Sequence, residues 1–178
     1  MAIITNNEEA LRVKCSDVLP EEVGSIVDLL EKELEHSERM GRPGIGLAAP
    51  QIGIAKNIAI IRINDHYKIN LVNCKIKDQY DLAMFKDEGC LSFPGRVENT
   101  MRYQEILIAN NLVEPNSFIL TGLPSVVVQH ELGHMLGILL PDVAIKKKIL
   151  VKSKLRPNDL CLCGKQNPPL KFKRCCGK

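Results

Sequence analysis

Apolar residues recur with two different spacings along the chain, and together they predict both helices and strands. In residues 19–44, LPEEVGSIVDLLEKELEHSERMGRPG, the spacing is helical. The apolar stripe consists of Val23, Ile26, Val27, Leu30 and Leu34. Pro20 is favourable near a helix start, and Gly41 with Pro43 predicts the end of the helix.

Short β-branched or alternating runs predict strands at 57–63, 67–73, 103–110 and 116–122. The glycine-rich stretch GIGLAAPQIGI, residues 44–54, predicts a loop that leads toward a strand. LPSVVVQHELGHMLGILL, residues 123–140, is long and apolar, and we interpret it as a buried helix. The expected fold class is α+β, with mostly antiparallel strands flanked by one early and one late helix.

Charge divides the chain into an acidic body and a basic tail. Residues 144–178 carry eleven Lys and Arg against one acid, Asp159, whereas residues 1–143 carry 13 basic and 20 acidic residues. The N-terminus has no basic region followed by an apolar run, and no apolar stretch approaches the roughly 20 residues that span a membrane. We therefore expect a cytoplasmic protein without a membrane partner.

The stretch VVVQHELGHMLG, residues 126–137, suggests a metal site. On a helix, His130 and His134 share one face, and Glu131 beside them is suited to act as a base. A catalytic site of this kind needs a third protein ligand. The extended zinc-protease pattern requires a histidine at position 140, where this chain has Leu140. Cys90 is a second candidate, although a lone cysteine is also common as a small buried apolar residue.

Three blocks in this order, GIGLAAPQ at 44–51, EGCLS at 88–92 and QHELGH at 129–134, resemble the signature motifs of the peptide deformylase family. The resemblance covers about residues 8–140. It implies antiparallel sheets around a buried HExxH helix, with Cys90, His130 and His134 binding one divalent metal. Ferrous iron is the expected metal, and zinc, nickel or cobalt are possible replacements. The implied activity is removal of the formyl group from the N-terminal formylmethionine of nascent polypeptides.

The resemblance also assigns roles to other residues. Glu131 is the expected general base, and the Gln51 side chain with the Leu91 backbone N–H is expected to stabilise the oxyanion. The Gly46 backbone is expected to pair with the substrate. The expected substrate-binding residues are Gly44, Ile45, Gly46, Glu88, Gly89, Leu123, Val126, Val127 and His130. Arg96 is the nearest candidate partner for Glu88, and Gly133 replaces the aspartate that is usual in the family.

The tail PNDLCLCGKQNPPLKFKRCCGK resembles a SEC-C type zinc motif. Four sulfurs, from Cys161, Cys163, Cys175 and Cys176, are expected to form a structural zinc site. The predicted organisation is a catalytic domain at 1–143, a basic linker at 144–156 and the zinc-binding tail at 157–178. The basic charge suggests contact with ribosomal RNA or with a protein near the ribosome.

Two other functions remain open at this point. A zinc endopeptidase is supported by HELGHMLG and opposed by Leu140. A catalytically inactive, deformylase-like binding protein is opposed by the presence of every expected catalytic residue.

Overall fold

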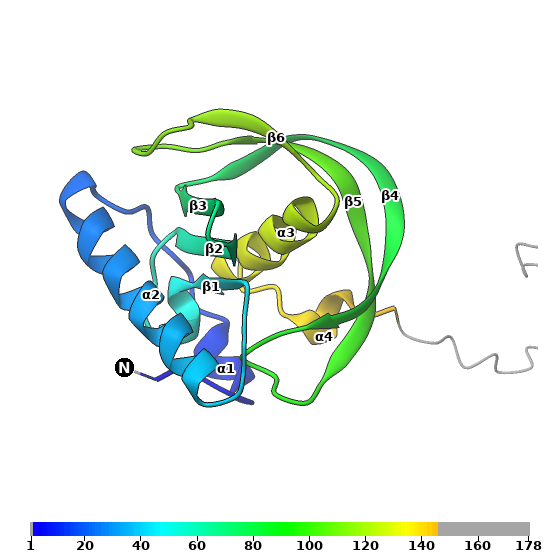
Figure 1. The fold of residues 1–178 in the computed structure, drawn as a ribbon, viewed down its shortest axis with the longest axis horizontal. Helices are drawn as coiled ribbons and strands as arrows, with labels where there is room; N and C mark the ends of the chain where they lie inside the picture. The colour runs from blue at the N-terminus through cyan, green and yellow to red at the C-terminus, as the bar shows by residue number, and fades with distance from the viewer. Residues whose placement is uncertain (1, 146–178) are drawn as a thin grey trace, which may run out of the picture. The chain divides into compact units, whose positions relative to one another are not determined.

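A computed structural model describes residues 2–145 as two three-stranded antiparallel sheets around one central helix (Figure 1). The strand orders are β1-β2-β3 and β4-β5-β6. The strands are β1 (Gly46–Ala48), β2 (Ile58–Asn64), β3 (Tyr67–Val72), β4 (Lys75–Gly89), β5 (Val97–Ala109) and β6 (Ser117–Thr121). The helices are α1 (Glu8–Leu11), α2 (Val23–Arg39), α3 (Leu123–Met135) and α4 (Leu140–Val143). Short 3-10 helices span Pro20–Glu22 and Ala49–Ile52. The predicted α+β class with antiparallel sheets is confirmed.

Helix α2 packs on the first sheet through the stripe that the sequence predicts. Ile26, Leu30 and Leu34 are buried, and they share a core cluster with residues of β1 and β2. The helix ends before Gly41, whose φ of 75° lies in the left-handed region that glycine tolerates best. The chain then turns into the stretch that leads to β1.

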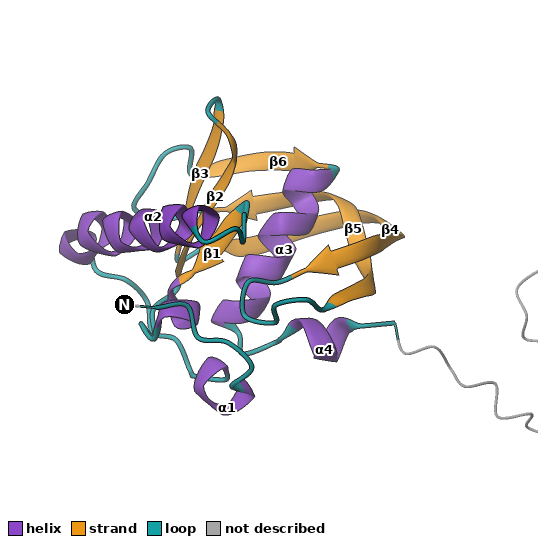
Figure 2. Ribbon diagram, turned by 60° about the horizontal axis from the view of Figure 1, so that its bottom comes forward, coloured by secondary structure: helices purple, strands orange, loops and turns teal. Residues whose placement is uncertain are grey.

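Helix α3 lies between the two sheets, as Figure 2 shows from a second direction. Val128 and Leu132 belong to a core cluster that also contains Ile61 of the first sheet and Ile106 of the second. Because both sheets cover this helix, it carries apolar residues on nearly every side and shows no clear amphipathic pattern. Its position fixes the two histidines relative to both sheets.

Three sequence expectations need correction. The late helix stops at Met135, not at residue 140, because Gly137 adopts a left-handed φ of 70° and Leu140 begins the separate helix α4. The glycine-rich loop contains the short strand β1 and a 3-10 helix. The long strand β4 and the first residues of β5 were not predicted. Residues 77–82 of β4 are all exposed, so the strand has no alternation of apolar and polar residues to reveal it.

Within residues 2–145, no helix has the length and apolar character that crossing a membrane requires.

Candidate active site

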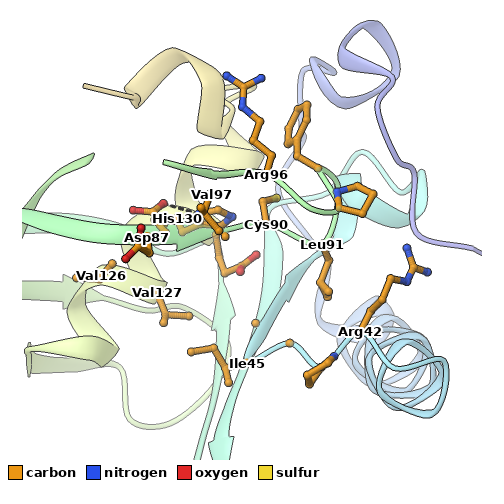
Figure 3. Close-up of a pocket in the computed structure, with 18 of the residues that line it drawn as sticks. Arg42, Ile45, Asp87, Cys90, Leu91, Arg96, Val97, Val126, Val127 and His130 are labelled. Carbon is orange, nitrogen blue, oxygen red and sulfur yellow. Dashed lines mark hydrogen bonds and ion pairs between the residues drawn. The ribbon is translucent and has the colours of Figure 1, made fainter. Parts of the chain in front are cut away.

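The three predicted metal ligands converge from two elements of the fold. His130 and His134 lie one turn apart on α3, with ring centroids 5.0 Å apart. Cys90 follows directly after β4, and Figure 3 labels Cys90 and His130. The Cys90 Sγ lies 3.2 Å from the His134 Nε2. One donor atom from each residue falls within a group whose members all lie within 4.8 Å of one another. A thiolate and two imidazoles are suitable ligands for divalent iron or zinc, so this donor set fits a metal.

Glu131 places a carboxylate beside these ligands. Its side chain is 4% exposed, and among residues 2–145 its Oε2 has no hydrogen-bond partner. Burial raises the pKa of this carboxyl group to about 7. A buried carboxylate oxygen without a partner is costly unless it serves a ligand or a reaction, so Glu131 fits the position of a base that binds a reacting water.

The surroundings shift the pKa values of the two histidines in opposite directions. Burial lowers the pKa of His134 to about 3, so its imidazole is neutral, which is the form that binds metals. Burial also disfavours a charge on His130, but its contacts with Cys90 and Glu88 outweigh burial and raise its pKa to about 10. A positive charge at this point, whether a proton or a metal ion, is therefore stabilised by the acidic groups around it.

Glu88 forms the centre of a buried network that supports His130. Its Oε1 lies 2.6 Å from the His130 Nδ1, and Thr100 Oγ1 donates to its Oε2 at 2.5 Å. Arg102 donates twice, from Nε at 2.9 Å and from Nη2 at 2.5 Å. Burial opposes ionisation of Glu88, but the hydrogen bonds from His130 and Arg102 prevail and lower its pKa to about 2.

The partner of Glu88 expected from the sequence is wrong. Arg96 forms an ion pair with Glu98 at 2.7 Å, and Figure 3 shows its side chain extending away from Cys90. Arg102 is the true partner, and it was missed because the strand predicted from the sequence starts at residue 103, whereas β5 begins at Val97 and contains Arg102. Alternation within β5 then directs Thr100 and Arg102 to the same buried face.

A hydrogen bond from a nearby backbone N–H fixes the orientation of the Gln51 side chain. The Ala48 N–H donates to its Oε1 at 2.8 Å, so the Nε2 group faces Cys90 Sγ at 3.8 Å and Ser92 Oγ at 3.1 Å. Ser92 is fully buried and was not assigned a role, although it lies in the EGCLS block. The Leu91 N–H has no acceptor within the part of the chain that the structure describes. Two donors therefore lie near the proposed ligand Cys90.

Glycine is required at two positions of the first motif. A Cβ on Gly46 would lie 2.5 Å from the Glu131 Oε1, and a Cβ on Gly44 would lie 2.6 Å from Leu91 Cδ1. Larger residues would displace the carboxylate or the leucine. These glycines therefore shape the site itself.

A cavity of about 680 Å³ opens onto this centre. The structure brings all the expected substrate-binding residues to its wall, namely Gly44, Ile45, Gly46, Glu88, Gly89, Leu123, Val126, Val127 and His130. Val126 and Val127 are buried, and Figure 3 shows them with Ile45 at this wall. Ile45 and Leu123 are 37% and 43% exposed and form the more open part of the wall. This lining suits an unbranched apolar side chain that enters from solvent.

Other expectations are resolved only in part. Leu140 is 2% exposed in the core, so it supplies nothing to the zinc-protease alternative, and Cys90 takes the third position in the ligand group. The four tail cysteines, Cys161, Cys163, Cys175 and Cys176, lie outside the described residues.

Comparison with known proteins places this geometry in one family. The model of the family described as polypeptide deformylase matches residues 1–149. The peptide deformylase of Natranaerobius thermophilus is 35% identical over 146 residues, which cover 80% of this chain and 90% of the relative. That of Aquifex aeolicus is 35% identical over 129 residues, which cover 65% and 76%. The crystal structure of Arabidopsis thaliana peptide deformylase 1B in complex with an inhibitor is 32% identical, with a TM-score of 0.69 and coverage of 84% of each chain.

Proposed function

The chain belongs to the peptide deformylase family and removes the N-formyl group from nascent polypeptides, and we propose that Cys90, His130 and His134 hold its catalytic divalent metal. The convergence of these three donor atoms beside the unpartnered carboxylate of Glu131 carries the proposal. A divalent metal held by these three residues would supply Lewis acidity for activating water and polarising the formyl carbonyl.

Glu131 moves the proton in this scheme. Its buried carboxylate takes the proton of the attacking water and gives it to the departing amine. The transfer needs no large movement, because the carboxylate already lies beside the ligand group and against the Gly46 backbone. The buried environment also keeps bulk water from competing for the proton.

Gln51 and Leu91 stabilise the oxyanion that develops on the formyl oxygen. The Gln51 Nε2 group and the Leu91 N–H are donors held by the surrounding structure, so they need no reorganisation when negative charge appears. Loss of one such donor typically costs a factor of about 10² to 10³ in rate.

The substrate peptide extends from this centre as an added strand. β1 is the edge strand of its sheet, and it pairs with β2 on one side only. Its Gly46 lines the cavity, so an extended peptide can pair with the free edge while its methionine side chain enters the wall formed by Val126, Val127 and Leu123. The peptide therefore runs along the edge of β1, away from the metal ligands and toward solvent.

Two substitutions test the proposed centre. Glu131→Gln should retain the metal at Cys90, His130 and His134 and lower kcat for a formyl-Met peptide by about 10² to 10⁴, because proton transfer fails while the ligands remain. Cys90→Ala should lose the metal, whereas Cys15→Ala, which removes a half-buried thiol elsewhere, should keep it. Metal content unchanged by Cys90→Ala would refute the ligand set.

We take ferrous iron as the native metal, with zinc, nickel or cobalt as replacements, and a cytoplasmic location. One relative, from Arabidopsis thaliana, is named as chloroplastic/mitochondrial. Metal analysis of protein purified without oxygen tests the first, and cell fractionation tests the second.

For the tail we propose a structural zinc held by the four cysteines and a contact with the ribosome through the basic residues of 144–178. A truncation should end after Ile145, because Ala144 bridges to Thr100 and the Ile145 N–H donates to Asn99 O at 2.7 Å. The truncated chain should hydrolyse small formyl-peptides normally, contain one metal fewer, and co-sediment less with ribosomes, with a difference that shrinks as salt rises. Equal co-sedimentation of the two forms would refute the docking role.

A further inference from the structure

A second, much smaller cavity lies behind the ligand His134. Its volume is about 10 Å³, and its wall includes Arg102, Gly133, His134, Ile138 and Leu140. This is close to the roughly 10–15 Å³ that one water molecule requires when cavities are measured with a water-sized sphere. It is distinct from the large substrate cavity, although His130 contributes to both.

The imidazole of His134 has an unmet hydrogen-bonding need on this side. Its side chain is almost fully buried, its Nε2 faces Cys90, and its Nδ1 has no partner within residues 2–145. When Nε2 binds a metal, Nδ1 carries the ring proton and is a donor. A buried donor without an acceptor costs roughly 1–3 kcal/mol, so an acceptor is expected here.

The glycine at position 133 makes room for that acceptor. A Cβ at this position would lie 3.1 Å from the Ile138 carbonyl oxygen, so that oxygen is close to Gly133. Gly133 also lines the small cavity. Arg102 adds a donor to the wall, since its Nε and Nη2 bind Glu88 and Nη1 remains for another acceptor. A water in this place would have polar groups of His134, Arg102 and Ile138 in the cavity wall, within the two to four partners that buried waters typically need.

We propose that this cavity binds one ordered water molecule that accepts the Nδ1–H of His134, so that Gly133 is a positioning residue of the metal site. The water accepts from His134 and from Arg102 and donates to Ile138. It holds the His134 ring in the orientation that keeps Nε2 toward Cys90 and links this ligand to the Glu88 network behind His130. The inference rests on the proposed role of His134 as a ligand.

Two substitutions at one position separate the water from simple strain. Gly133→Ala and Gly133→Ser add the same Cβ with the same approach to Ile138, but only serine adds a hydroxyl that can replace the water oxygen. In the metal-loaded full chain, competition with a chelator should show that Gly133→Ala binds its metal about 10 to 100 times more weakly than the unaltered protein. This is the usual effect of losing a partner of a ligating histidine. Gly133→Ser should recover most of that loss. Thermal unfolding of the metal-free forms should be equal for the two variants, since they share the strain.

A high-resolution crystal structure of the unaltered protein gives an independent readout. We expect density for one water within hydrogen-bond distance of the His134 Nδ1, and its absence in Gly133→Ala. Metal affinities that are equal in the alanine and serine variants, or a His134 Nδ1 bonded directly to a protein carbonyl, would overturn the proposal. Retention of metal by Cys90→Ala would instead overturn the ligand set and leave the density at Nδ1 as the test of the water.

Discussion

Replacing Arg102 with methionine tests the buried network that supports the metal site. Arg102 and Glu88 are only 10% and 5% exposed, and Glu88 accepts from Arg102, from Thr100 and from the ring of His130. Methionine keeps most of the volume of the arginine stem but removes the charge and both donors. Glu88 then remains as a buried carboxylate without its main cationic partner.

The magnitude follows from the burial of the pair. Removing one partner of a buried ion pair typically costs about 3–5 kcal/mol, because the other charge stays buried and uncompensated. For a chain of this size, each kcal/mol shifts the Tm by about 2–4 °C, so Arg102→Met should lower the Tm by about 6–20 °C. Metal affinity should fall as well, by about 10–100-fold, because Glu88 orients the His130 ring.

Arg96→Met is the matched control. Arg96 also pairs with a glutamate, but it is 44% exposed and its partner Glu98 is 25% exposed. Exposed pairs contribute about 0.2–1 kcal/mol, so this variant should shift the Tm by less than about 4 °C. Both variants are compared by thermal unfolding with and without metal, and by metal release to a chelator.

A double variant separates the charge from the packing. Glu88→Gln with Arg102→Met removes both buried charges, so its cost should be clearly smaller than the sum of the two single costs. If the costs add, or if Arg102→Met is no more damaging than Arg96→Met, the Glu88 network is not the support of the metal site that the structure indicates.

Three further predictions follow from individual contacts. Gly46→Ala should lower kcat by at least about tenfold, because the new Cβ displaces the Glu131 carboxylate; steady-state kinetics measure this. Gly24→Ala, at an exposed position of α2 with open space around it, should raise the free energy of unfolding by up to about 1 kcal/mol, which thermal unfolding measures. Arg12→Ala should lower the Tm and hasten metal release, because Arg12 donates to the Gly137 carbonyl just after the end of α3. Arg39→Ala, in an exposed pair, should change neither. The iron form should lose activity in air while the nickel form persists, since the thiolate of Cys90 beside iron is open to oxidation; equal lifetimes with and without oxygen would contradict this.

The group formed by Cys90, His130 and His134 could be predicted from the sequence because most of the pattern is local. His130 and His134 are held together by one turn of a helix, and Cys90 lies in a short motif whose neighbours have local roles. The apolar stripe of α2 was equally accessible, because one face of that helix is buried and the other is exposed. Local spacing determines these features before the chain forms any tertiary contact.

The contact between Glu88 and Arg102, which supports His130, could not be predicted from local spacing in the sequence, because the pairing of two strands creates it. Glu88 meets Arg102 only because β4 and β5 pair in an antiparallel register that shifts between Phe85 and Glu88. The shift inserts one extra residue into β4 and changes which side chains share a face. Arg96 is closer to Glu88 than Arg102 along the sequence. The register of β4 and β5 nevertheless brings Arg102, and not Arg96, next to Glu88.

In the part of the chain that the structure describes, the buried polar atoms without a partner lie at the proposed reactive centre, and this observation needs no motif. Within residues 2–145, the buried side-chain nitrogen and oxygen atoms without a hydrogen-bond partner are Glu131 Oε2 and His134 Nδ1. Buried polar atoms elsewhere in this region have partners, as Asn110 and Gln129 illustrate with bonds to neighbouring backbone. A fold that satisfies its other buried polar groups and leaves two open on one turn of α3 retains a local cost there of about 1–3 kcal/mol per group. That cost is recovered when ligands complete the site: a reacting water on the Glu131 side and an ordered water on the His134 side. The two atoms therefore serve different purposes on the same helix: Glu131 Oε2 takes part in catalysis, and His134 Nδ1 helps to hold its ring in position.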